Sequence, residues 1–116
     1  MAESELEGPR QEIDRIDREL VRLLNQRARI SLEIARRKVR SGESVFVPDR
    51  EQQVVRNVLD ASTGPLKPEH LRAIYREILS SSRSLQRRLK VAYLGPAATF
   101  THQAALQIFG DATELL

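Results

Sequence analysis

Two cations interrupt an apolar helix face, and they are the residues of this chain best suited to chemistry. From about Arg10 to Val39 the sequence predicts a long amphipathic helix, because apolar side chains recur on one face at about 100° per residue. Arg27 and Lys38 project from the middle of that face. Cations are rarely buried without a partner, and no acidic residue on this face is placed to neutralise both. We therefore expect an anionic ligand in a buried site.

Polar side chains on two later predicted helices extend this set. Ser82 lies among the apolar residues of the third helix, and Gln86 follows one turn later. Glu51 falls within the apolar face of the second helix, with Arg50 at its edge. Arg10 lies near a predicted helix start, where the helix dipole disfavours a cation, so it has no local structural reason to be there. Arginine, lysine, carboxylate, hydroxyl and amide groups together suit a small dianion that carries a hydroxyl.

Apart from Arg10 and Arg50, each of these residues, taken singly, also has a purely structural explanation. Arg27 is long enough to bury its stem and keep its tip in water. Lys38 near a helix end and Glu51 near a helix start both complement the helix dipole. Ser82 is able to bond back to its own backbone. The functional interpretation therefore depends on the whole set.

The elements that position these groups are helices. The first helix contains about thirty residues, which at about 1.5 Å each span roughly 45–50 Å, more than a compact domain of this size measures across. Its apolar face needs more partner surface than the rest of the chain supplies, so we expect an intertwined homodimer. The sequence further predicts helices over residues 48–61 and 67–89, a strand over 90–94 and a helix over 99–109. The predicted fold class is all-α, a three-helix protomer with a very long first helix.

Composition limits the class of protein. With 116 residues we expect one domain, and with no cysteine we expect neither disulfides nor thiolate metal sites, as suits a cytoplasmic protein. No apolar run reaches the roughly 20 residues of a membrane span. The acidic N-terminus lacks the apolar core of a secretory signal. There is no paired-histidine metal motif, glycine-rich phosphate loop or serine–histidine–acid set, so we predict no metal and no cofactor.

Three stretches of the chain carry a family resemblance: residues 10–20, residues 23–27 followed by Lys38, and residues 47–51. Ser82 and Gln86, four apart, complete the set. In these motifs the chain resembles the all-helical chorismate mutases, and residues 47–51 resemble the second motif of that family. The resemblance covers roughly residues 6–89. Residues 91–101 look like the first strand and turn of prephenate dehydratase, so we expect residues 1–89 to be a mutase domain and 90–116 the truncated start of a dehydratase domain, without dehydratase activity in this chain.

The resemblance implies a role for each candidate residue. Two carboxylates of chorismate would be held by four residues: Arg10 from the partner subunit, Arg27, Arg50 and Ser82. Lys38 and Gln86 would hydrogen-bond the ether oxygen, and Glu51 would accept from the ring hydroxyl. Some members of the family have an acidic residue where this chain has Val47, so hydroxyl recognition here would rest more heavily on Glu51. The implied reaction forms prephenate for phenylalanine and tyrosine biosynthesis, with no nucleic-acid or membrane partner.

Two alternatives remain open at this point. A related lyase would bind isochorismate on the same helical scaffold and release pyruvate, although the dehydratase-like tail favours prephenate as the product. A non-enzymatic alternative is a basic dimerisation module that binds nucleic acid through the outward arginines of the first helix. The net charge is only +3, from 19 basic and 16 acidic residues, and the outward arginines alternate with Glu19, Gln26 and Glu33 without aromatic side chains. This pattern is more typical of a solvated helix face.

Overall fold

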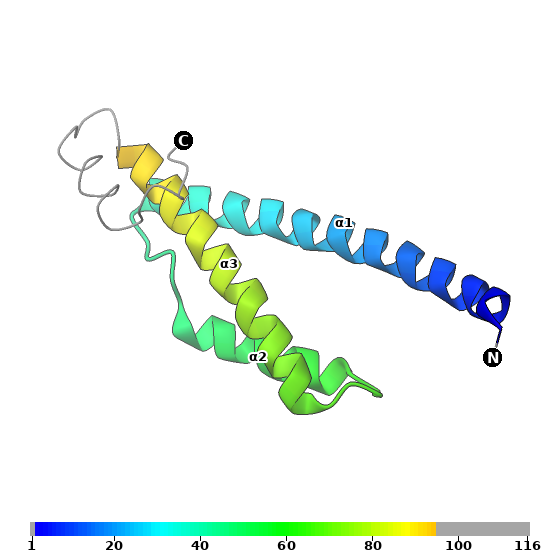
Figure 1. Ribbon diagram of the computed structural model, residues 1–116. Coiled ribbons are helices and arrows are strands. Elements are labelled where there is room, and N and C mark those ends of the chain that lie inside the picture. The colour runs from blue at the N-terminus through cyan, green and yellow to red at the C-terminus, as the bar shows by residue number, and fades with distance from the viewer. Residues whose placement is uncertain (1, 95–116) are drawn as a thin grey trace. The chain divides into compact units, whose positions relative to one another are not determined.

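The computed structural model describes residues 2–94, with their side chains up to residue 92. Three helices make up this part of the chain: α1 (Glu3–Ser41), α2 (Pro48–Ala61) and α3 (Pro68–Leu94) (Figure 1). No strand occurs among the described residues, and the predicted all-α class with a very long first helix is confirmed. The chain divides into two units, residues 1–30 and the residues from Ser31 onward.

Helix α1 is 39 residues long and begins earlier than predicted. The helix was predicted from about Arg10, but it starts at Glu3 and has Pro9 inside it. Glu3 and Glu5 lie in the first turn, where negative charge complements the helix dipole and favours this earlier start. Pro9 lacks a backbone N–H, so one hydrogen bond is lost near the N-terminal end of α1, and the helix continues through this position.

The apolar face of α1 is exposed in the single chain. All seven large apolar residues predicted to share this face retain 43–57% of their accessible surface: Ile13, Ile16, Leu20, Leu23, Leu24, Ile30 and Ile34. Among the described hydrophobic residues only Ala35 and Leu79 are buried. One copy of the chain therefore does not bury the face that its own sequence makes apolar.

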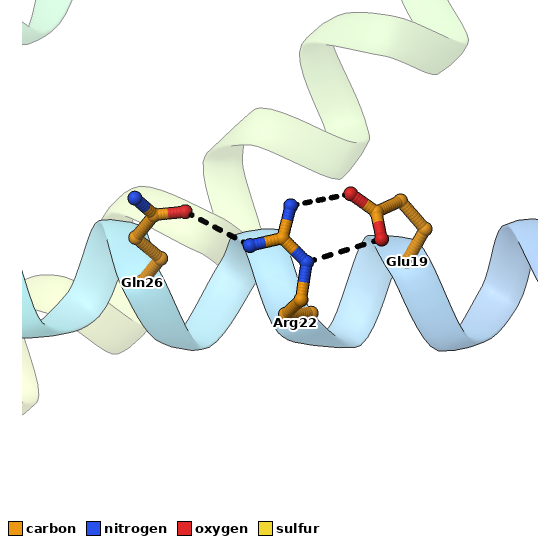
Figure 2. Close-up of polar contacts among 3 residues, drawn as sticks. All are labelled: Glu19, Arg22 and Gln26. Carbon is orange, nitrogen blue, oxygen red and sulfur yellow. Dashed lines mark hydrogen bonds and ion pairs between the residues drawn. The ribbon is translucent and has the colours of Figure 1, made fainter.

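The polar face of α1 carries local ion pairs. Arg22 donates from Nε to Glu19 at 3.0 Å and from a terminal nitrogen to Gln26 at 3.4 Å (Figure 2). The hydrogen bond from Arg22 lowers the pKa of the Glu19 carboxyl, and the same bond raises the pKa of Arg22. Arg15 likewise binds Glu12, which raises the pKa of Arg15. These pairings are those of a solvated helix face.

The C-terminus of α1 is closed by glycine. Gly42 has a φ of +76°, and its N–H donates to the carbonyl of Val39 while the N–H of Glu43 donates to the carbonyl of Lys38. This pair of bonds is the Schellman arrangement, which favours glycine because a Cβ is strained in the left-handed region. The cap fixes where the chain leaves α1, directly after the turn that carries Lys38.

Helices α2 and α3 pack against each other in the second unit. The predicted apolar face of α2 is confirmed, since its four residues are partly buried: Val54, Val55, Val58 and Leu59. On α3, Leu79 is buried, and Leu71, Tyr75, Ile78 and Leu85 are partly buried as predicted. Ile74 was predicted to point inward but is 46% exposed, so that prediction is wrong for the single chain.

The predicted strand over residues 90–94 is wrong. Helix α3 continues through these residues to Leu94 instead of ending at Leu89. A short apolar run does not distinguish strand from helix by itself. Extending an existing helix adds one hydrogen bond for each residue fixed, whereas a strand needs a neighbouring strand, and the described residues offer none. The turn predicted at Gly95-Pro96 and the helix predicted over 99–109 lie outside the described residues.

Candidate active site

Lys38 lies in the last turn of α1 and is partly buried, as the apolar-face prediction requires. Its carbonyl accepts the N–H of Glu43 at 2.9 Å and the hydroxyl of Ser41 at 3.1 Å. The backbone at Lys38 is therefore fixed by the helix cap. An ammonium group carried on a fixed, half-buried turn is able to act as a charged hydrogen-bond donor.

Glu51 lies in the first turn of α2 and is paired with Arg83 of α3. The two side chains keep only 24% and 29% of their accessible surface, respectively. Arg83 also lies over the ring of Phe46, with 5.8 Å from its Cζ to the ring centroid, which is within cation–π range. Glu51 was predicted from the sequence and Arg83 was not. The position of Arg83 directly after Ser82 is the signal that the sequence offered.

Gln86 of α3 is tied to α1 within the second unit. Its Nε2 donates to the hydroxyl of Ser31 at 2.8 Å, in a partly buried contact. The carboxamide nitrogen carries two N–H donors, so one remains for another acceptor. Ser31 was not among the predicted residues. Its place one turn after Arg27 on the same helix is the signal that the sequence offered.

The remaining predicted residues differ in their surroundings. Arg50 is exposed and donates to the side chain of Gln53 at 2.9 Å, while Ser82 is partly buried on α3. In the first unit, Arg27 is partly buried and Arg10 is exposed and paired with Glu3. The expectation that Arg10 lacks a local structural role is therefore wrong, because the early start of α1 brings Glu3 within its reach.

Two pockets in the second unit meet at Arg83. The first has a volume of about 470 Å³ and is lined by side chains of α2 and α3, among them Glu51, Arg72, Arg76 and Arg83. The second, of about 360 Å³, is lined in part by Phe46, Arg83 and Gln86. Guanidinium groups predominate among the charged groups of both pockets, so both favour an anionic guest.

The chemistry of these groups is binding and charge stabilisation. Lys38 and Gln86 are hydrogen-bond donors, Glu51 is an acceptor, and Arg50 and Ser82 are able to donate to a carboxylate. Among residues 2–94 no group of three histidine, aspartate or glutamate side chains is placed to hold a metal ion. No helix in the same range is both long and apolar enough to cross a membrane.

Comparison with known proteins shows which family and which proteins this chain is similar to. The model of the chorismate mutase type II family matches residues 9–87. A bifunctional chorismate mutase/prephenate dehydratase of Aquifex aeolicus is 47% identical in an alignment of 110 positions that covers 91% of this chain but 30% of that protein. The protein of the same description from Pseudomonas aeruginosa is 40% identical over 115 residues, 95% of this chain and 32% of its own length. The chain therefore spans about a third of these relatives.

A solved structure agrees with the family match. Chorismate mutase (form II) from Thermus thermophilus superposes with a TM-score of 0.70 at 32% sequence identity. The similarity covers 72% of this chain and 96% of that one. The matched part of this chain thus corresponds to nearly the whole of the Thermus protein.

Proposed function

From the premise that this chain belongs to the chorismate mutase type II family, we propose that it rearranges chorismate to prephenate. The observation that carries the proposal is the range of the family match, residues 9–87, which contains all seven residues selected for their chemistry. These are Arg10, Arg27, Lys38, Arg50, Glu51, Ser82 and Gln86. The expected absence of a metal and a cofactor stays a prediction.

The first part of the proposed mechanism is conformational. The rearrangement breaks one C–O bond and forms one C–C bond within a single molecule, so the reacting carbons must be brought together. Arg10, Arg27, Arg50 and Ser82 would hold the two carboxylates of the folded conformer, since guanidinium groups bind carboxylates in a rigid fork. Fixing that conformer converts rotational freedom lost on binding into rate.

The second part is electrostatic. Negative charge grows on the ether oxygen as the C–O bond breaks. We infer that Lys38 and the second N–H of Gln86 donate to that oxygen, where a preorganised donor stabilises the transition state more than the ground state. Glu51 would accept from the ring hydroxyl and so orient the ring. The partial burial of Lys38, Glu51 and Gln86 supports these roles, because such contacts strengthen away from water.

A second copy of the chain is the partner we propose for the exposed face of α1. The apolar residues of that face are 43–57% exposed in one chain, and an apolar stripe repeated along a helix is typically buried against another helix. A twofold dimer would cover the same stripe on both copies. Arg10 would then reach the partner's site, which makes each site composite.

The place of this domain in a longer protein is also proposed. The relatives described above are bifunctional, and this chain corresponds to about a third of their length. We propose residues 1–89 as the mutase domain and residues 90–116 as the start of the dehydratase region, so that dehydratase activity is not expected from these 116 residues alone. The absence of cysteine supports a cytoplasmic location.

A direct assay tests the proposed activity. Purified chain incubated with chorismate should remove the absorbance of chorismate and form prephenate, and isochorismate should yield no pyruvate. Lys38→Ala protein with an unchanged circular dichroism spectrum serves as the matched control and should be strongly impaired. Release of pyruvate from isochorismate without conversion of chorismate would establish the lyase instead. Inactivity of the folded dimer on both substrates would overturn the proposal.

A further inference from the structure

The Arg83–Glu51 ion pair differs from the ion pairs described along α1. Four pairs within α1, such as Arg37–Glu33, leave their side chains 49–76% exposed. The Arg83–Glu51 pair joins α3 to α2 across 32 residues of sequence and leaves 29% and 24% exposed. An ion pair that is partly shielded from water is screened less and holds its geometry better than one on the surface.

Arg83 is held from a second side by the segment that precedes α2. Its guanidinium carbon lies 5.8 Å from the centroid of the Phe46 ring. An aromatic face and a carboxylate together fix the plane of a guanidinium group more firmly than either does alone. The orientation of Arg83 is thus set by two elements other than its own helix.

Arg83 also lies at the junction of the two pockets. It lines the pocket that contains Glu51 and the pocket that contains Gln86, and Gln86 is one turn further along α3. Glu51 has two carboxylate oxygens, and the hydrogen bond from Arg83 goes to Oε1. The other oxygen remains able to accept from a ligand.

We propose that Arg83 is a positioning residue that fixes the carboxylate of Glu51 for the hydroxyl of the substrate. The inference rests on the proposed function. Glutamate has several rotatable bonds, and a carboxylate that moves freely among rotamers contributes less to orienting a ligand. Arg83 acts through Glu51, so the loss of Arg83 should weaken the contact between the Glu51 carboxylate and the substrate hydroxyl.

Kinetics of matched variants test this role. Arg83→Met keeps an unbranched stem but removes the guanidinium, and Arg37→Met removes a more exposed arginine that also pairs with a glutamate. We expect Arg83→Met to lower kcat/KM by about 10- to 100-fold, the usual range for a lost hydrogen bond to a charged group. KM should change more than kcat, because the hydroxyl contact exists in both ground and transition states. Arg37→Met should stay within about twofold of the parent chain.

A double-mutant cycle separates positioning from general support of the fold. If Arg83 acts through Glu51, the double variant Arg83→Met/Glu51→Gln should have a kcat/KM less than about threefold below that of Glu51→Gln alone. Guanidinium ions added to Arg83→Ala at low concentration should restore part of the activity, which they would not do for a merely destabilised protein. Arg83→Lys, which keeps the charge, should fall between the parent and Arg83→Met.

The outcomes distinguish this inference from the proposed function. Multiplicative effects of the two substitutions, or an Arg83→Met variant no worse than Arg37→Met, would overturn the role of Arg83 while the mutase activity stands. If the parent chain does not convert chorismate, the proposed function fails, and the role of Arg83 toward substrate fails with it. Loss of folding in Arg83→Met is recognised by circular dichroism, and the comparison then uses Arg83→Lys.

Discussion

The Nε2 atom of Gln86 donates a hydrogen bond to the hydroxyl of Ser31 at 2.8 Å, across 55 residues of sequence. The bond connects α3 with α1 inside the second unit and sets which way the carboxamide faces. In the proposed mechanism Gln86 donates its other N–H to the breaking ether bond. Ser31 would thus orient the N–H of Gln86 that donates to the substrate.

Removing the Ser31 hydroxyl tests that control. Ser31→Ala should lower kcat/KM by about 2- to 10-fold, the effect of one neutral hydrogen bond that orients a catalytic donor. The chorismate absorbance assay measures the change. Ser62→Ala is a suitable control, because the exposed Ser62 hydroxyl accepts from the nearby N–H of Gly64 and lines neither pocket. Equal rates for the two variants would show that Ser31 does not orient Gln86.

Substitution of Lys38 tests the electrostatic half of the mechanism. Lys38→Ala should lower kcat by about 100-fold or more, because a fixed charged donor acts mainly in the transition state. Its neighbour Arg40 is exposed in the same turn, so Arg40→Ala controls for loss of charge at the helix end. Ordinary turnover by a well-folded Lys38→Ala protein would remove Lys38 from the mechanism.

Mixing two inactive variants tests the composite site. Arg10→Ala and Arg27→Ala homodimers should each be strongly impaired, because every site lacks one guanidinium. After random subunit exchange, about half of the dimers are mixed, and one site in each mixed dimer has both arginines, as twofold symmetry requires. About a quarter of the parent activity should return. Mixtures that exchange subunits but stay inactive would refute the sharing of sites.

The helix cap at Gly42 gives a prediction about stability. Gly42→Ala should destabilise the fold by about 1 kcal/mol, because alanine must adopt the left-handed conformation that this cap requires. A Cβ at this position would have open space around it, so the cost is conformational and not steric. Gly42→Asn should recover part of the loss, since asparagine tolerates this region better. Urea unfolding at equal protomer concentration measures both, and an unchanged midpoint in Gly42→Ala would contradict the prediction.

The sequence predicted α2 within its observed bounds and placed Lys38, Glu51, Ser82 and Gln86 on partly buried helical positions. Periodicity succeeds here because an amphipathic helix repeats its apolar face over several turns. It does not reveal partners that are distant in sequence, so Arg83 and Ser31 were missed. Helix ends were also misplaced, at the start of α1 and the end of α3. The local residue preferences that mark a helix end are weak compared with the stabilisation gained by continuing the backbone hydrogen bonds.

The continuity of α3 through Leu89 has a consequence for any protein that carries this domain at its start. Because the helix has no break between Gln86 and Leu94, the angle between these two positions about the helix axis is fixed. Inserting a single residue at Leu89 would turn Leu94 by about 100° about the axis and advance it by about 1.5 Å relative to Gln86. The domain border expected at this point is a stiff rod and not a hinge, so the sequence length there sets the direction in which the chain leaves the catalytic helices.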